Sequence, residues 1–82
     1  MTEPFVIGGA YRTNYRHETG DIIWQVTRLA KQKDGCIRAF GNILYNPWSD
    51  YRWPTWNSAE PESHIRLSED EATLFCIIGM GG

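Results

Sequence analysis

Residues 22–45, with the sequence IIWQVTRLAKQKDGCIRAFGNILY, decide the fold of this chain. Every second residue from Ile22 to Val26 is a large apolar one, which is the pattern of one face of a β-strand. Asp34-Gly35 readily supplies the positive φ angles of a hairpin turn. The stretch therefore predicts a β-hairpin in which residues 22–32 pair with residues 36–45.

The first half of this stretch also allows a helix over residues 22–33, because Ile22, Val26 and Leu29 fit helical spacing. Its β-branched and aromatic side chains lose freedom in a helix, whereas they suit a pleated surface. We therefore predict a strand here. A helix is the alternative, and it would change the fold class from mainly β to α+β.

The second half of the stretch is interrupted by Gly41, which predicts a bulge or a bend before Ile43, Leu44 and Tyr45 continue the strand.

The flanking segments predict shorter elements. Phe5-Val6-Ile7 reads as an apolar strand or strand end that breaks at Gly8-Gly9, where two glycines allow the backbone to change direction, and the first strand resumes at Tyr11 and Tyr15. Residues 46–61 hold three prolines and three tryptophans without a sustained period, so they predict a long irregular loop. His64-Ile65-Arg66-Leu67 alternates as a short strand.

The end of the chain predicts a helix. Ser68 and Glu71 have the spacing of a capping box, so we expect a helix over residues 69–78 that ends at Gly79. The whole chain, 1–82, then forms a single mainly β domain: a small antiparallel open barrel of about five strands with one short C-terminal helix. In its layout of strands and turns this architecture resembles the SH3-like class.

Composition and charge exclude several classes of protein. Hydrophobic residues make up 41% and charged residues 22%, which indicates a folded domain rather than a disordered tail. The net charge of −2 argues against binding phosphate backbones by charge alone. The longest apolar run, Leu74 to Ile78, is too short to cross a bilayer, and no secretory signal is recognisable. We expect a cytoplasmic protein without a membrane partner.

The aromatic residues of the predicted loop are the most informative feature for function. In so small a domain, two or three of these rings should belong to the core. The turn-forming residues between the rings prevent all of them from pointing the same way, so some should be exposed. Exposed Trp and Tyr side chains are typical anchors of protein interfaces. We therefore expect a non-catalytic binding module, an adaptor or a small inhibitor of the kind that phages encode. Its contacts with another protein would come from Trp48, Tyr51, Arg52, Trp53 and Trp56.

A second possible function is the binding of single-stranded nucleic acid by a small barrel. Residues 1–40 carry a net charge of +2, against −4 for residues 41–82. Arg12, Arg16 and Arg28 in the basic half would contact phosphates while the aromatic rings stack on bases.

A third possibility comes from the last residues. Gly81-Gly82 follows the apolar run from Leu74 to Ile78. This ending resembles the tail of ubiquitin-like and sulfur-carrier proteins, whose last strand is apolar and whose C-terminal carboxylate is activated by adenylation. With a helix over residues 22–33, the order of elements would also suit that β-grasp family.

No motif in the chain predicts catalysis. His17, His64, Cys36 and Cys76 are residue types found in structural zinc sites, but they lack the close ligand spacing of such sites. Gly8-Gly9 lacks the lysine and hydroxyl residues of a phosphate loop. We therefore expect no catalytic residue, no metal and no cofactor. The two cysteines are expected to be reduced thiols, with a single disulfide as the alternative.

Overall fold

The predicted hairpin is the centre of the fold. The computed structural model describes residues 4–81, and in it β2 (Ile23–Lys31) pairs in antiparallel register with β3 (Ile37–Tyr45). Gly35 has a φ angle of 90°, and the amide of Gly35 donates to the carbonyl of Gln32 at 3.1 Å. The predicted Asp-Gly turn is confirmed, and the alternative helix over residues 22–33 is wrong. β2 is stabilised as a strand because it buries side chains on both of its faces.

Gly41 marks a β-bulge, as its position in the sequence predicts. The register of the hairpin shifts between Val26 and Arg28, and Gly41 is the Cα partner of Val26. A Cβ atom at Gly41 would overlap the backbone carbonyl of Gln25, so no other residue fits this close approach of the two strands.

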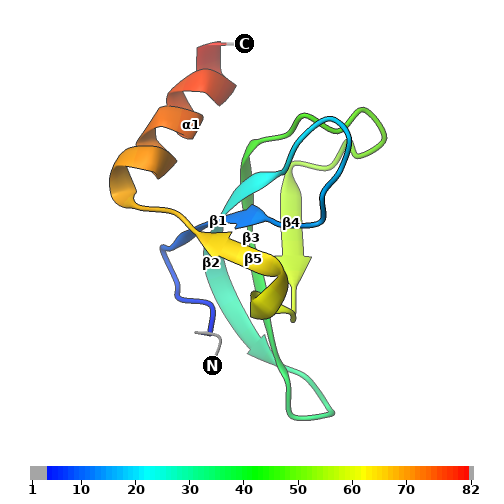
Figure 1. Ribbon diagram of the computed structural model, residues 1–82. Helices are drawn as coiled ribbons and strands as arrows, with labels where there is room; N and C mark the ends of the chain where they lie inside the picture. The colour runs from blue at the N-terminus through cyan, green and yellow to red at the C-terminus, as the bar shows by residue number, and fades with distance from the viewer. Residues whose placement is uncertain (1–3, 82) are drawn as a thin grey trace.

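Three short strands complete one open, fully antiparallel sheet, in the order β4-β3-β2-β1-β5 (Figure 1). They are β1 (Ala10–Thr13), β4 (Thr55–Ser58) and β5 (His64–Arg66), and a single 3-10 turn, η1 (Pro61–Ser63), precedes β5. The fold is therefore mainly β with five strands, as predicted.

Two predicted segments need correction. The first strand begins at Ala10 rather than at Phe5, because residues 5–7 lie outside the ladders of the sheet, although Phe5 itself is buried. The irregular loop ends earlier than expected, since β4 lies within residues 46–61. β4 is a polar edge strand of four residues, which is too short for an alternation of apolar and polar side chains to be recognised in the sequence. Its pairing with Ala39 to Asn42 of β3 holds it in the sheet.

One face of the sheet carries an aromatic core. Its buried members, called the main core below, come from the N-terminal segment and from β1, β2 and β3. Half-buried aromatic residues of the second half of the chain pack against them. The main core consists of Phe5, Tyr11, Ile22, Trp24, Val26 and Ala39, and Leu29, Ile43, Trp48, Tyr51 and Trp56 surround it.

The other face of the sheet is partly covered by α1 (Glu69–Gly81). Ala72 and Phe75 of the helix pack against a small cluster made of Ala10, Ile23 and Leu67. The capping box forms as predicted: the Ser68 hydroxyl accepts the amide proton of Glu71 at 3.2 Å, and the Glu71 carboxylate accepts the amide proton of Ser68 at 3.3 Å.

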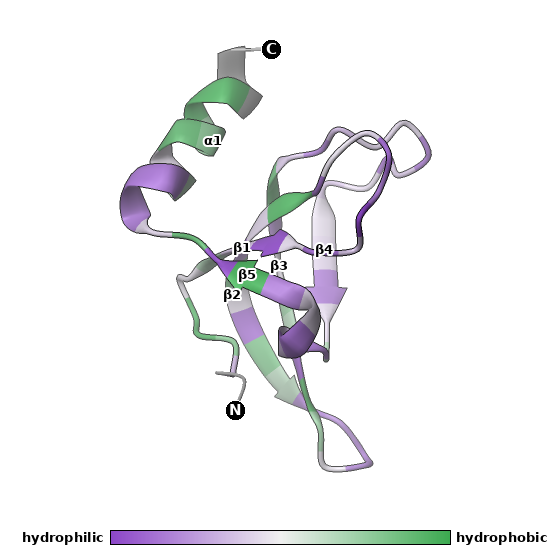
Figure 2. Ribbon diagram, in the orientation of Figure 1, coloured by the Kyte–Doolittle hydropathy of each residue, from purple (hydrophilic) through white to green (hydrophobic). Residues whose placement is uncertain are grey.

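The predicted end of the helix at Gly79 is wrong. α1 continues through Gly79 to Gly81, because a glycine stops a helix only where it turns into the left-handed region. The apolar turns of α1, residues 74–78, lie at the opposite end of the molecule from the turn of the β2–β3 hairpin (Figures 1 and 2). Within residues 4–81, no helix has the length and apolar character needed to span a membrane.

Candidate functional site

Two loops that are far apart in the sequence pack against each other beside the main core. Residues 14–22 join β1 to β2, and residues 46–54 join β3 to β4. The His17 ring stacks on the Trp48 indole with 4.5 Å between their centroids and 23° between their planes. The Trp48 Nε1–H also donates to the carbonyl of Gly20 at 2.6 Å. Trp48 therefore ties the second loop to the first.

The second loop is also held from within. The Asn46 side chain donates to the carbonyl of Tyr51 at 2.7 Å and accepts the amide proton of Trp48 at 2.8 Å. The Tyr51 hydroxyl donates to the carbonyl of Thr55, at the start of β4. A loop built in this way presents its exposed side chains from a defined backbone.

The structure divides the five predicted partner-binding residues into two groups. Trp48, Tyr51 and Trp56 pack against the main core, and the Tyr51 and Trp56 rings meet edge to face with their centroids 5.0 Å apart. Arg52 and Trp53 point outward, and 71% of the Trp53 side chain is exposed. The expectation that two or three of the rings are core holds. Trp48 and Trp56 are half-buried packing residues, and their contacts with a partner stay a prediction.

Sequence reasoning missed the contribution of the first loop. Tyr15 is partly exposed, and its ring centroid lies 6.5 Å from that of Trp48 and 6.3 Å from that of Trp56. Local spacing gave no sign of this contact, since more than thirty residues separate Tyr15 from either tryptophan.

The two histidines lie in different environments. His17 is half-buried, its Nδ1 accepts the amide proton of Thr19 at 3.3 Å and lies 2.8 Å from the Thr19 hydroxyl, and its Nε2 lies 4.0 Å from Asp50. His64 is largely buried among the rings of Phe5, Tyr15 and Trp24. Its Nδ1 lies 3.0 Å from the carbonyl of Glu60 and must therefore donate to it.

Burial sets the protonation of His64. Loss of hydration lowers the pKa of His64, and the carbonyl and charge of Glu60 and the charge of Glu62 oppose this effect only in part. Its Nε2 is buried and has no hydrogen-bond partner within residues 4–81. The neutral ring therefore packs among the aromatic side chains of the core.

Of the three arginines predicted for nucleic-acid binding, Arg12 and Arg28 lie apart on the sheet. Arg12 of β1 pairs with Asp21 at 3.4 Å, and Arg28 lies over the Phe40 ring, 4.2 Å from its centroid. Arg12 is the partner of Ile23, so Arg28 lies roughly 15 Å further along β2 at the usual rise per strand residue. Arg16 is in the first loop, with a φ angle of 57°.

The remaining candidates are also apart. Cys36 near the hairpin turn and Cys76 on α1 are both free thiols, so the alternative of a disulfide is wrong. In the part of the chain that the structure describes, no three His, Cys, Asp or Glu residues are grouped as a metal site would need. Residues 74–78 are helical, whereas the resemblance to carrier proteins implies an apolar last strand. Gly82 lies outside the described residues.

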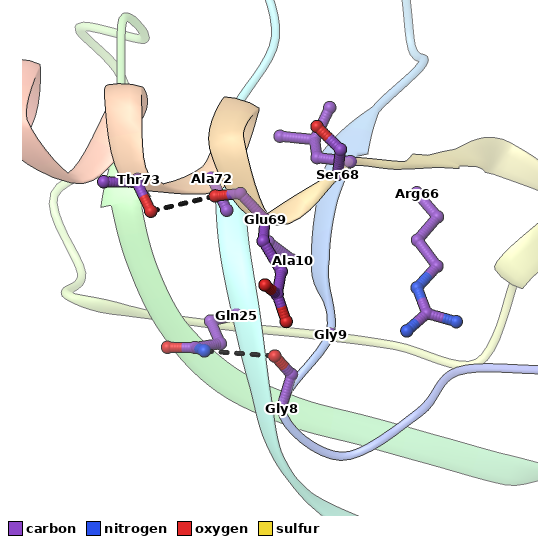
Figure 3. A pocket seen from close by; sticks show the side chains of 10 residues that line it. Gly8, Gly9, Ala10, Gln25, Arg66, Ser68, Glu69, Ala72 and Thr73 are labelled. Carbon is purple, nitrogen blue, oxygen red and sulfur yellow. Dashed lines mark hydrogen bonds between the residues drawn. The ribbon is translucent and has the colours of Figure 1, made fainter.

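A cavity of about 340 Å³ lies between the Gly8–Gly9 backbone, β2 and the start of α1 (Figure 3). The Gln25 amide in its wall donates to the carbonyl of Gly8 at 3.1 Å, and the Thr73 hydroxyl donates to the carbonyl of Glu69 at 2.9 Å. The charged side chains that line it, Arg66 and Glu69, are opposite in sign. The cavity therefore selects neither an anion nor a cation.

Comparison of the chain with models of protein families, with curated proteins and with solved structures finds no match.

Proposed function

We propose that this protein is a non-catalytic binding module that holds another protein through the outer side of residues 46–54. One observation carries the proposal: Trp53 is a large aromatic side chain that is 71% exposed, on a loop whose other rings are packed. A tryptophan has only two rotatable side-chain bonds, so it buries a large area on binding at a low entropic cost, and Trp is enriched among interface hot spots. Arg52 beside it adds a second residue type enriched in such sites.

An SH3-like arrangement is part of the same proposal. It is supported by the strand order β4-β3-β2-β1-β5, in which four strands follow each other as a meander and β5 returns beside β1. Architecture of this kind does not by itself confer a function, so the proposal depends on the exposed loop.

Affinity capture from the native host, using the chain and two variants, tests this function. Trp53→Ala should reduce recovery of a specific partner at least about tenfold, the effect of losing an interface hot spot. Ile65→Ala, which shortens a partly exposed side chain on β5, is the matched control and should capture as well as the unchanged chain.

Circular dichroism of the three proteins shows whether each is folded. The proposal is wrong if folded Trp53→Ala captures every partner that the unchanged chain captures.

A further inference from the structure

Two neighbouring aromatic rings each bury a nitrogen atom that has no hydrogen-bond partner within residues 4–81. The two atoms are Nε1 of Trp24 and Nε2 of His64. Trp24 is fully buried, and its ring centroid lies 5.6 Å from that of His64, with 68° between the two planes. Buried polar groups of folded proteins are almost always hydrogen-bonded, so two unpaired atoms on adjacent rings need a partner that they can share.

The two atoms have opposite hydrogen-bonding roles. The indole Nε1–H of Trp24 can only donate. Since His64 uses its Nδ1–H for the Glu60 carbonyl, Nε2 of the neutral ring can only accept. The shared partner must therefore accept one hydrogen bond and donate another. A water molecule does both, whereas a cation would be repelled by the indole N–H and an anion has no proton to offer Nε2.

The sheet brings the two rings to the same face. Trp24 of β2 is the Cα partner of Tyr11 of β1, and Tyr11 is in turn the partner of Arg66 of β5. His64 lies two residues before Arg66, so its side chain is on the same face of the sheet as that of Trp24. Because β1 lies between β2 and β5, the two rings meet across β1 (Figure 1).

Other aromatic rings enclose this contact. The Phe5 ring centroid lies 5.1 Å from that of His64 and 5.4 Å from that of Trp24, and the Tyr15 centroid lies 5.7 Å from that of His64. Apolar ring faces offer a water molecule few other partners, so a water held here would bond mainly to the two nitrogens. Proteins contain about one buried water per 27 residues, which is about three for a chain of 82 residues.

We propose that one buried water molecule joins Trp24 to His64, accepting the indole proton and donating to Nε2 of the imidazole. The His64 ring continues the connection through Nδ1–H to the carbonyl of Glu60, directly before η1. One chain of hydrogen bonds would then run from β2 to the segment that leads into β5. It would fix the position of β5 relative to β2, although the two strands are not neighbours in the sheet.

A crystal structure at a resolution that shows ordered water tests the site. A single water should lie within about 3.2 Å of both Trp24 Nε1 and His64 Nε2. In His64→Phe, which removes the acceptor, this water should be lost. Tyr15→Phe is the matched control, because it removes a neighbouring hydroxyl but leaves both nitrogens, and it should keep the water.

Two crystallographic results would overturn the proposal. One is the absence of a water bonded to both nitrogens in the unchanged chain, and this result decides even if His64→Phe does not fold. The other is loss of the water in Tyr15→Phe, which would show that the tyrosine hydroxyl holds it.

Hydrogen exchange of the indole protons, followed by NMR, tests the enclosure of the site in solution. The Trp24 indole proton should exchange at least about a hundredfold more slowly than that of the exposed Trp53. Equal exchange rates would mean that bulk solvent reaches Trp24, and the proposal of a single enclosed water would then be wrong.

Discussion

At the scale of single residues, His64 shows how a polar side chain becomes part of the core. Its Nδ1–H donates to the Glu60 carbonyl at 3.0 Å, while aromatic rings surround the rest of the imidazole. Folding removes water from the ring and lowers the pKa of His64 below its ordinary value of 6.5. A histidine of this kind stabilises the fold only while it is neutral.

This predicts a pH dependence of stability. The unfolded chain takes up a proton on His64 as pH falls through about 6.5, whereas the folded chain does so only at lower pH. The free energy of unfolding should therefore be highest above that pH and should decrease as the pH falls from there toward the folded pKa. Urea denaturation between about pH 5 and 8 measures it. His64→Phe should flatten this part of the profile, and an unchanged slope in that variant would assign the effect to other groups.

The tryptophans predict a contrast in stability. Trp56→Ala should lower the free energy of unfolding by about 2 kcal/mol or more, because it empties space beside Tyr51 and Trp48. Trp53→Ala should change it by less than about 0.5 kcal/mol, since its side chain lies in solvent. Chemical denaturation of both variants measures the difference. Equal losses would mean that Trp53 is also a packing residue.

At the scale of elements, the β2–β3 hairpin depends on two glycines for different reasons. At Gly41 a side chain would collide with the backbone of β2, whereas at Gly35 there is open space and only the positive φ angle opposes a side chain. A side chain at position 41 could be accommodated only by separating β2 from β3 and breaking their hydrogen bonds. A side chain at position 35 would strain the turn but leave its contacts in place.

The two positions should therefore respond differently to alanine. Gly41→Ala should lower the free energy of unfolding by more than about 2 kcal/mol or prevent folding, while Gly35→Ala should cost about 1 kcal/mol. Thermal or urea unfolding followed by circular dichroism compares them. A Gly41→Ala protein as stable as Gly35→Ala would contradict the close contact at the bulge.

At the scale of the whole molecule, the proposed partner surface and the exposed apolar side of α1 belong to different parts of the chain. The partner surface belongs to residues 46–54, whereas the exposed apolar side chains of α1 are Leu74, Ile77 and Ile78. Trp53→Ala should therefore reduce capture of a partner, and Ile77→Glu should leave it unchanged. Equal loss of capture in the two variants would mean that α1 is part of the partner surface.

The sequence by itself determined the elements whose reasons are local. Alternation in β2, the Asp-Gly turn, the bend at Gly41 and the Ser68 capping box each depend on residues a few positions apart, so each could be predicted. Edge strand β4 could not be predicted, because a polar strand of four residues is defined by its partner strand. The end of α1 could not be predicted either, because Gly79 can continue a helix as well as stop it.

Only the tertiary structure decided which aromatic residues are buried. The sequence identified the tryptophan-rich segment and indicated that some of its rings are core, but it did not separate Trp56 from Trp53. Burial depends on what approaches from elsewhere in the chain. Tyr15 and His17 pack against Trp48 across about thirty residues, and His64 completes the same cluster from β5. Such contacts have no local pattern, since they arise only when the sheet brings its loops together.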